Sequence, residues 1–306
     1  MHRANIGGDY EEVKGDPVEP AVGPTIRPRN LAGYHCPVPV LSLDDIDDER
    51  VTIYRSIRDK FARNTGLFVA EGRLVVRRLL ESRFATQSVM VTPRGFYAVE
   101  DLVAARPDLP VYVVPQILMN AVVGFNIHRG CLAIGERPAP VSWEEVARGA
   151  QRLVALERVG DADNVGATFR AAAAFAADGL LLDEHCADPL YRKAVRTSMG
   201  AALEVPFATD VPWPATVESL KEEGWTILGL TPSPAAPPLS EVVAVAGAHR
   251  VVLILGHEGE GLTAGALGAC THLARIRTTE AVDSLNVGMA AGIALYELSR
   301  AAGTSE

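Results

Sequence analysis

The chain has 306 residues, of which 48% are hydrophobic, and its formal net charge is −9. This length is enough for one large or two ordinary domains, and the acidic total by itself argues against a nucleic-acid partner. Four cysteines without CxxC spacing indicate reduced thiols rather than a disulfide or zinc framework, and we expect no metal. No secretory signal and no apolar run of roughly 18 residues is found, so we expect a soluble, cytoplasmic protein that does not cross a membrane.

The charge is distributed unevenly along the chain. Residues 1–50 hold 5 basic against 10 acidic residues, residues 51–140 hold 12 against 7, and residues 141–306 hold 12 against 21. The central block is therefore basic, and its basic residues are arginines apart from Lys60. Because arginine forms forked hydrogen bonds with phosphate, this block is a candidate surface for binding nucleic acid.

The first half of the chain divides into a tail and a small domain. Residues 1–47 are rich in proline, glycine and charge, with little periodicity, and we expect a flexible tail. Beyond it, helical spacing at ERVTIYRSIRDKFARN and RLVVRRLLES alternates with the strand-like runs GLFVAEG, SVMVT, VYVVP and CLAIG. This alternation predicts an α/β domain over residues 48–138. Two prolines then interrupt both patterns, so residues 139–147 are expected to be a linker.

A second α/β unit is predicted over residues 148–306. Its strands are apolar on both faces, which is typical of a mainly parallel sheet covered by helices. The predicted strands span 152–159, 179–184, 225–231, 250–256 and 273–277, with helices at 164–177 and 285–300. Ligands of such sheets bind beyond the carboxyl ends of the strands, so three of these strand exits are candidate sites.

The first exit leads into DADNVGATFRAAAAFAADG. Asp163 or Asn164 can cap the following helix, and its alanines favour helix formation. Arg170 stands in the second turn of this otherwise aliphatic helix. Such an arginine either binds an anionic group or extends its charge into water, and this segment alone favours the second interpretation.

The second exit is LILGHEGEGL, whose glycines have the spacing GxxGxG rather than GxGxxG. Glu258 and Glu260 would repel a phosphate, which argues against a dinucleotide or a phosphate-binding loop. A ligand with positive charge and no phosphate, such as S-adenosylmethionine, would tolerate both acids. A purely structural glycine turn is the alternative.

The third exit is DSLNVGMAAGIALYEL. Asp283 or Ser284 can cap a helix with small residues at Gly288, Ala291 and Gly292. The run is too short to span a membrane. Small residues at this spacing let another backbone approach closely, so we expect tight packing against a neighbouring segment or a partner subunit.

In their order and spacing, NVGATFRA, LGHEGEGL and SLNVGMAAGIALYE resemble the three motifs of the SpoU (TrmH-like) RNA 2′-O-ribose methyltransferases of the SPOUT superfamily. The resemblance covers about residues 148–302, and RTSMGA is similar to the family's RxSMGA segment. GLFVAEGRLVVRRLLES and HRGCLAIGERP resemble the RNA-binding domain, similar to a ribosomal-protein fold, that often precedes the catalytic domain.

This resemblance implies a C-terminal α/β domain with a deep trefoil knot, a rare exception to the rule that chains do not thread. It also implies a homodimer through this domain, with each site borrowing from both subunits. The reaction would transfer a methyl group from S-adenosylmethionine to a ribose 2′-hydroxyl of rRNA or tRNA, with the RNA held by the basic domain 48–138.

Carried over position by position, the resemblance also implies site residues. Because an arginine stays protonated, Arg170 is interpreted as a clamp on a phosphate that stabilises the forming alkoxide, rather than as a base. Glu258 is assigned to the geometry of the loop and the dimer before chemistry. The implied catalytic residues are Asn164, Arg170, Glu258, Ser284 and Asn286, and the implied cofactor contacts are Leu255, Gly256, Gly261, Ile276, Leu285 and Asn286.

Two pairs of residues depart from the family pattern. Gly288 and Met289 stand where the family often has Ser-Val, and Arg277 and Thr278 stand where it usually has Pro-Met. Arg277 would add positive charge beside a cationic ligand. An RNA-binding protein of this fold that has lost catalysis is therefore the alternative. A Rossmann-type oxidoreductase is disfavoured, because GxGxxG followed by an acid about 20 residues later is missing.

Overall fold

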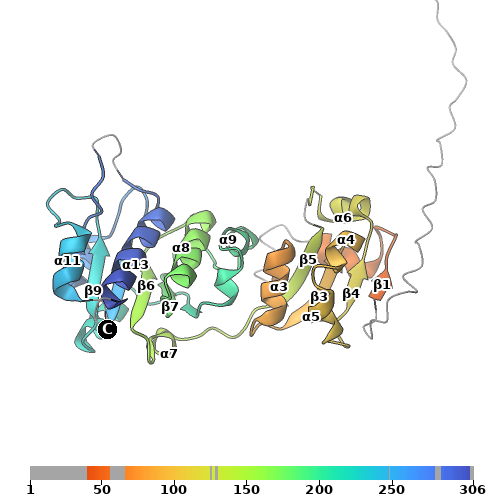
Figure 1. Ribbon diagram of the computed structural model, residues 1–306, viewed down its shortest axis with the longest axis horizontal. Helices are drawn as coiled ribbons and strands as arrows, with labels where there is room; N and C mark the ends of the chain where they lie inside the picture. Colours follow the sequence, from red (N-terminus) through yellow and green to blue (C-terminus); the bar gives the residue numbers. More distant parts are fainter. Residues whose placement is uncertain are drawn as a thin grey trace, which may run out of the picture. The chain divides into compact units, whose positions relative to one another are not determined.

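Two sheets organise the chain (Figure 1). The computed structural model describes residues 40–55, 66–124, 126–127, 130–247, 249–279 and 284–303. The first sheet has the strand order β1-β4-β3-β5-β2, and the second has the order β11-β9-β10-β6-β7-β8. The predicted α/β class with mainly parallel sheets is confirmed, whereas the trefoil knot and the predicted domain boundaries stay predictions.

The first sheet is mixed. β1, β4 and β3 pair in parallel, while β5 runs antiparallel to both β3 and β2. The strands are β1 Val40–Ser42, β2 Leu67–Glu71, β3 Thr86–Val91, β4 Val111–Val113 and β5 Cys131–Glu136. The helices are η1 Glu49–Val51, α1 Thr52–Arg55, α3 Arg73–Glu81, α4 Pro93–Phe96, α5 Glu100–Ala104 and α6 Gln116–Val123. The predicted strands and the helix at α3 are confirmed, and the helix expected over 49–64 lies outside the described residues from 56 on.

Two short elements correct the sequence interpretation. β1 lies within the stretch predicted as flexible tail, where Val40 pairs with Val111 of β4. α7, Trp143–Ala147, lies within the predicted linker, and it is capped by Ser142, which accepts a hydrogen bond from the Glu145 amide. Elements of three to five residues are too short to show a clear periodicity, so packing rather than pattern determines them. Residues 1–39 of the tail lie outside the described residues.

Each pair of neighbouring strands in the second sheet is parallel. Its strands are β6 Arg152–Leu156, β7 Gly179–Leu182, β8 Phe207–Ala208, β9 Thr226–Leu230, β10 Val251–Leu255 and β11 His272–Ala274. Its helical segments are α8 Ala162–Ala174, α9 Arg192–Thr197, η2 Ala201–Leu203, α10 Ala215–Glu222, α11 Leu239–Ala246, α12 Ala264–Ala269 and α13 Val287–Gly303. The five predicted strands and both predicted helices are confirmed, with ends that differ by a few residues.

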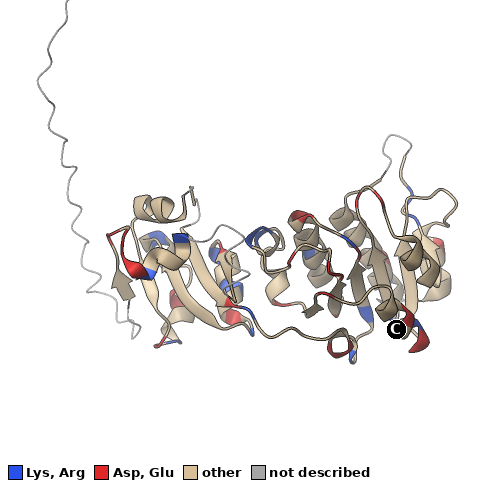
Figure 2. Ribbon diagram, turned by 180° about the vertical axis from the view of Figure 1, so that it is seen from behind, with Lys and Arg blue, Asp and Glu red and all other residues tan. Residues whose placement is uncertain are grey.

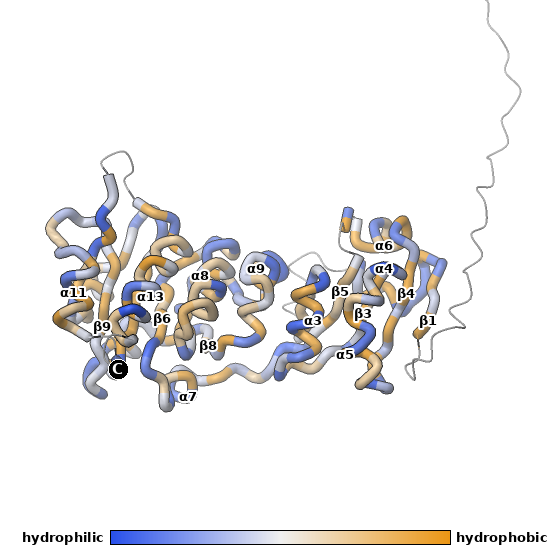
Figure 3. Tube along the Cα trace, viewed as in Figure 1, coloured by the Kyte–Doolittle hydropathy of each residue, from blue (hydrophilic) through white to orange (hydrophobic). Residues whose placement is uncertain are grey.

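Helices cover both faces of this sheet, and the strands supply a separate core to each face. Val154 and Leu156 belong to a core that includes α8, α11 and α13, whereas Leu153 and Ala155 belong to a core that includes α7, α10 and α12. The strands are hydrophobic along their length (Figure 3). Alternation of side chains along each strand therefore explains why both faces had to be apolar.

α13 packs side by side with α8 (Figure 1). A Cβ atom at Gly288 would lie 2.4 Å from the Cβ of Ala167, closer than two carbons can approach. A Cβ atom at Gly292 would lie 3.9 Å from that of Ala171, an ordinary contact. The close approach predicted for the small residues is thus confirmed at Gly288, and the neighbouring backbone is that of α8.

The sequence also predicted reduced cysteine thiols and the absence of a membrane-spanning segment. Cys131, Cys186 and Cys270 are free, and burial raises the pKa of Cys131 to about 12 and that of Cys270 to about 11. Cys36 lies outside the described residues. Among the residues that the structure describes, no helix is both long enough and apolar enough to cross a membrane. The cytoplasmic location stays a prediction.

Candidate functional site

A cavity of about 490 Å³ lies beyond the carboxyl ends of β9, β10 and β11. Its lining residues fall within the segments 230–233, 255–267, 275–278 and 284–290. Three of these segments follow strands directly, and the fourth leads into α13. The volume lies within the roughly 300–1,000 Å³ of small-molecule sites, and the position is the one expected for a ligand of a parallel sheet.

The structure brings most of the predicted cofactor residues to this cavity. Asn286 is the one predicted contact that does not line it. Ser284 and Glu258, predicted as catalytic, line the cavity as well. The predicted cofactor contacts along its wall are Leu255, Gly256, Gly261, Ile276 and Leu285.

The loop after β10 forms one wall of the cavity by turning back on itself. The Gly261 amide donates to the His257 carbonyl at 2.8 Å, and the His257 Nδ1 accepts from the amides of Gly259 at 3.0 Å and Glu260 at 3.1 Å. A Cβ atom at Gly256 would lie 2.5 Å from the carbonyl carbon of Gly261. Only glycine at 256 therefore allows the two ends of the turn to meet.

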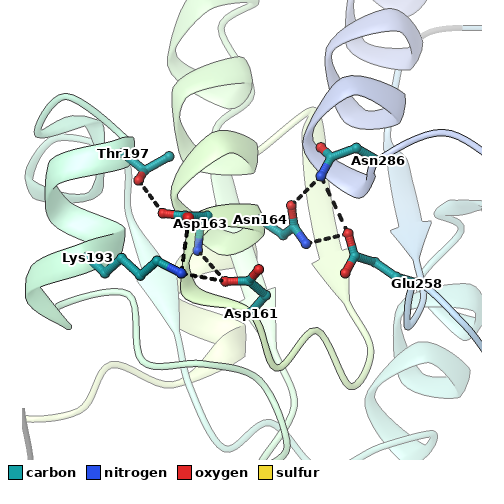
Figure 4. A network of polar contacts seen from close by, with 7 residues as sticks. All are labelled: Asp161, Asp163, Asn164, Lys193, Thr197, Glu258 and Asn286. Carbon is teal, nitrogen blue, oxygen red and sulfur yellow. Dashed lines mark hydrogen bonds and ion pairs between the residues drawn. The ribbon is translucent and has the colours of Figure 1, made fainter. Parts of the chain in front are cut away.

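Three predicted residues, one from each motif, meet beside the cavity (Figure 4). The Asn164 side-chain amide donates to the Glu258 Oε1 at 2.5 Å, and that of Asn286 donates to the Asn164 Oδ1 at 2.6 Å and to the same Glu258 oxygen at 3.4 Å. The Asn286 Oδ1 in turn accepts from the Met289 amide at 3.2 Å, at the start of α13. We call Asn164, Glu258 and Asn286 the polar triad. It fixes α8, the loop after β10 and α13 relative to one another.

The start of α8 differs from the sequence prediction. Its N-cap is Asp161, which accepts from the Asp163 amide at 2.9 Å, and not Asp163 or Asn164. Because the helix begins earlier, the buried Asn164 side chain is available for the polar triad. The Asp163 carboxylate accepts from the Thr197 hydroxyl at 2.7 Å and lies 3.0 Å from the Lys193 ammonium, and these partners lower its pKa (Figure 4).

Arg170 is the predicted site residue that the structure keeps apart from the polar triad. It lies six residues beyond Asn164, about 9 Å further along the α8 axis, and its side chain is exposed. Within the described residues, its guanidinium has no hydrogen-bond or ion-pair partner and does not line the cavity. The side chain is therefore available to a molecule outside this protomer.

The two arginines near the end of β11 have different surroundings. Arg277, the departure from the family pattern, extends to Glu241 of α11 at 3.2 Å and does not line the cavity. Arg275 does line it, and its Nε donates to the Ala236 carbonyl at 2.9 Å. The positive charge of Arg277 is thus directed to a carboxylate outside the cavity, whereas that of Arg275 lies at the cavity wall.

Sequence reasoning missed Arg275, and it missed Glu157 and Arg158 at the end of β6. Glu157 is only 1% exposed and accepts two hydrogen bonds from Thr263. Arg158 has a left-handed backbone, with φ of 58°, and pairs with Glu260 at 2.6 Å. The sequence did contain a sign of Glu157, because this acidic residue directly follows the apolar run LVAL. Charged residues are rarely buried unless they have a partner.

Comparison with known proteins identifies the family. Residues 151–296 match the model of the SpoU rRNA Methylase family. An uncharacterised tRNA/rRNA methyltransferase of Mycobacterium bovis is 40% identical over 261 residues, which make up 84% of this chain and 90% of that protein. These 261 residues exceed the segment 151–296 that the family model matches, so the similarity extends beyond that segment.

Two solved structures share the fold. An AdoMet-bound rRNA methyltransferase from Sinorhizobium meliloti has a TM-score of 0.71 at 24% identity, over 85% of this chain and 98% of that one. An RNA 2′-O ribose methyltransferase has a TM-score of 0.68 at 21% identity, over 86% of this chain and 99% of that one. The resemblance seen in the three motifs is therefore confirmed. By its sequence relatives and its family model, the chain belongs to the SpoU rRNA methylase family.

Proposed function

We propose that the protein transfers a methyl group from S-adenosylmethionine to a ribose 2′-hydroxyl of rRNA or tRNA. The observation that carries the proposal is the polar triad, in which residues of all three motifs meet beside a cavity at the carboxyl ends of parallel strands. The names of the relatives support an RNA substrate, and the neighbour described as an RNA 2′-O ribose methyltransferase supports the ribose as acceptor.

The cavity, at about 490 Å³, is large enough for S-adenosylmethionine. This cofactor supplies a methyl group bonded to a positively charged sulfur. Glu258, Glu260 and Arg275 line the cavity; because Glu260 is paired with Arg158, the carboxylate of Glu258 is the one that favours a cation. The residues that would hold the cofactor are Leu255, Gly256, Gly261, Ile276 and Leu285, with Asn286 at the rim.

The residues at the head of α13 would orient the acceptor. Ser284 lines the cavity and is exposed, so its hydroxyl can hydrogen-bond a ribose that enters from solvent. The polar triad holds Asn286 and Glu258 in place while the ribose binds. Arg170 would bind the neighbouring phosphate and stabilise the negative charge that develops as the 2′-hydroxyl loses its proton.

A homodimer would supply Arg170 to the site. The residues Met289, Ile293 and Tyr296 form an apolar stripe on α13, at 57%, 39% and 55% exposure and at helical spacing. This stripe lies on the helix that packs beside α8, the helix that carries Arg170. We propose that two copies associate through the stripe, so that Arg170 of each protomer reaches the cavity of its partner.

The basic central block offers fewer free charges for RNA than its composition indicates. Arg77 pairs with Asp101, Arg78 with Glu204, and Arg137 with Asp188. In the region of the first sheet, basic and acidic residues adjoin one another (Figure 2). Arg83 and Arg94 are exposed and have no carboxylate partner among the described residues. We propose that these two arginines contribute to the RNA contact of this region.

A transfer assay with mapping of the product tests the proposed function. The protein is incubated with S-adenosylmethionine labelled in its methyl group and with rRNA or tRNA that lacks the modification, and the RNA is then hydrolysed in alkali. A ribose methyl group blocks attack by the 2′-oxygen, so we expect label in an alkali-resistant dinucleotide. Label on a base would overturn the ribose acceptor. RNA binding without transfer to any RNA would favour the non-catalytic RNA-binding protein.

A further inference from the structure

The loop of residues 256–262, which forms one wall of the cavity, is attached at both ends to a single residue. Glu157 follows β6, and its amide donates to the carbonyl of Leu255 at 2.9 Å, just before the loop begins. Its carboxyl group accepts from the amide of Thr263 at 2.8 Å and from the Thr263 hydroxyl at 2.6 Å, just after the loop ends. One residue thus joins the two ends of the loop to the neighbouring strand.

These hydrogen bonds are shielded from water, because Glu157 is only 1% exposed. Both carboxyl oxygens are used, one by the amide and one by the hydroxyl of Thr263. The hydroxyl also accepts from the Ala266 amide at 3.2 Å, which caps α12. The Thr263 hydroxyl therefore donates to Glu157 and accepts from the Ala266 amide of α12, and these two bonds fix its orientation. A buried group that loses such a partner is costly to the structure.

The next residue contacts the middle of the same loop. Arg158 is held in its left-handed conformation by a hydrogen bond from its amide to the Asp183 Oδ2 at 3.0 Å, and its guanidinium reaches the Glu260 Oε2 at 2.6 Å. This ion pair is solvent-exposed, with 40% and 65% of the two side chains accessible, so it contributes little by itself. Of the two attachments to the end of β6, the buried one at Glu157 is therefore the stronger.

We propose that Glu157 is a positioning residue for the cofactor cavity. It acts through the loop, whose residues line the cavity and whose Glu258 anchors the polar triad, and it touches neither ligand nor cofactor itself. The inference rests on the proposed function, since it concerns the affinity of the same cavity. A correctly placed wall is needed before the cofactor arrives, so a loosened loop lowers affinity without removing any direct contact.

Replacement of the carboxyl group by an amide tests this role. In Glu157→Gln, the negative charge is lost and one acceptor oxygen becomes an NH₂ donor, so at most one of the two hydrogen bonds that Glu157 accepts from Thr263 is kept, and a hydroxyl that faces the NH₂ group must turn its proton away. We expect the affinity for S-adenosylhomocysteine, measured by titration calorimetry, to fall about tenfold or more, because a buried hydrogen-bonding group that loses its partner is costly to the loop. The KM for S-adenosylmethionine should rise similarly, with the KM for RNA unchanged. Glu144→Gln, an exposed change on α7, is the matched control.

A double-mutant cycle with Thr263 separates positioning from a general loss of structure. Thr263→Val also removes the cap of α12, so it should weaken binding at least as much as Glu157→Gln; the double variant should be no weaker than Thr263→Val, and Thr263→Ser should bind like the wild type. Additive losses, or a Glu157→Gln variant with wild-type affinity, would overturn the positioning role alone. Failure of the wild-type protein to bind S-adenosylhomocysteine would instead overturn the proposed function and the inference together.

Discussion

At the scale of single residues, Arg170 is a predicted site residue for which the described residues provide no structural role. It is exposed on α8 and has no partner among the described residues, so the protomer gains little stability from it. We expect Arg170→Ala to reduce methyl transfer at least about 100-fold, the scale of a lost transition-state contact. Affinity for S-adenosylhomocysteine should change less than about twofold, because the proposed contact of Arg170 is with a phosphate of the RNA and not with the cofactor.

Arg148→Ala is the matched control for this variant, since Arg148 is also exposed and follows a helix far from the three motifs. Rates with labelled cofactor, together with calorimetric titration, check both parts of the prediction. A large loss of cofactor affinity in Arg170→Ala would show that the arginine belongs to the cofactor site and not to the phosphate.

The identity of the polar triad could be predicted from motifs, but its contacts could not. Asn164 lies 94 residues before Glu258 and 122 before Asn286, and no local pattern joins such distant side chains. Glu157 was missed for a different reason. The sequence placed it within the strand predicted over 152–159, and its contacts exist only because the sheet brings Leu255 and Thr263 beside it.

At the scale of elements, the contact between α8 and α13 depends on one of two glycines in the same helix. Gly288→Ala places a methyl group against Ala167, and we expect it to reduce the free energy of unfolding by about 1–3 kcal/mol. Gly292→Ala meets an ordinary contact and should be neutral or slightly stabilising, because alanine favours the helix. Denaturant unfolding of both variants measures the difference. Equal losses would show that helix packing is not the cause.

The start of α8 should carry a pH-dependent contribution to stability. Hydrogen bonding from Thr197 and the charge of Lys193 lower the folded-state pKa of Asp163 below its ordinary 3.8. Its stabilisation is therefore fully present above the unfolded pKa and is lost as the pH falls through the lowered folded pKa. We expect Asp163→Asn to be less stable than the wild type at pH 7, with a difference that shrinks as the pH falls below about 3.8. Denaturant titrations at several pH values measure this, and a constant difference would contradict it.

Long elements were predictable and short ones were not. The run RVVLILG defined β10, and the alanine-rich stretch after Asn164 defined α8, because each is long enough to show its period. α12 consists of AGALGA, which has no apolar face to recognise, and it exists because Thr263 caps it and Ala266 is buried against the sheet. β1 is similar, since three residues gain a strand conformation only by pairing with β4.

At the scale of the whole molecule, the proposed dimer can be broken at one position. Ile293 is the middle residue of the apolar stripe on α13, and a carboxylate there would face the same stripe of the partner. We expect Ile293→Asp to be monomeric in sedimentation at micromolar concentration and to lose methyl transfer. Val245→Asp, on the exposed side of α11 at 84% exposure, is the matched control and should leave the assembly unchanged. If Ile293→Asp is still dimeric and active, the apolar stripe is not the dimer interface.

The order in which the cavity is built along the chain has a consequence for synthesis. Every residue that lines it lies between Leu230 and Ala290, although the sheet that supports it begins with β6 at Arg152. A growing polypeptide can therefore complete its first sheet and pair β6 with β7 and β8 while it still has nowhere to bind a cofactor. The nascent chain would gain the ability to bind cofactor and transfer methyl groups only late, when α13 packs against α8. Arrested nascent chains that stop before β10 should not retain labelled cofactor, whereas released chains should.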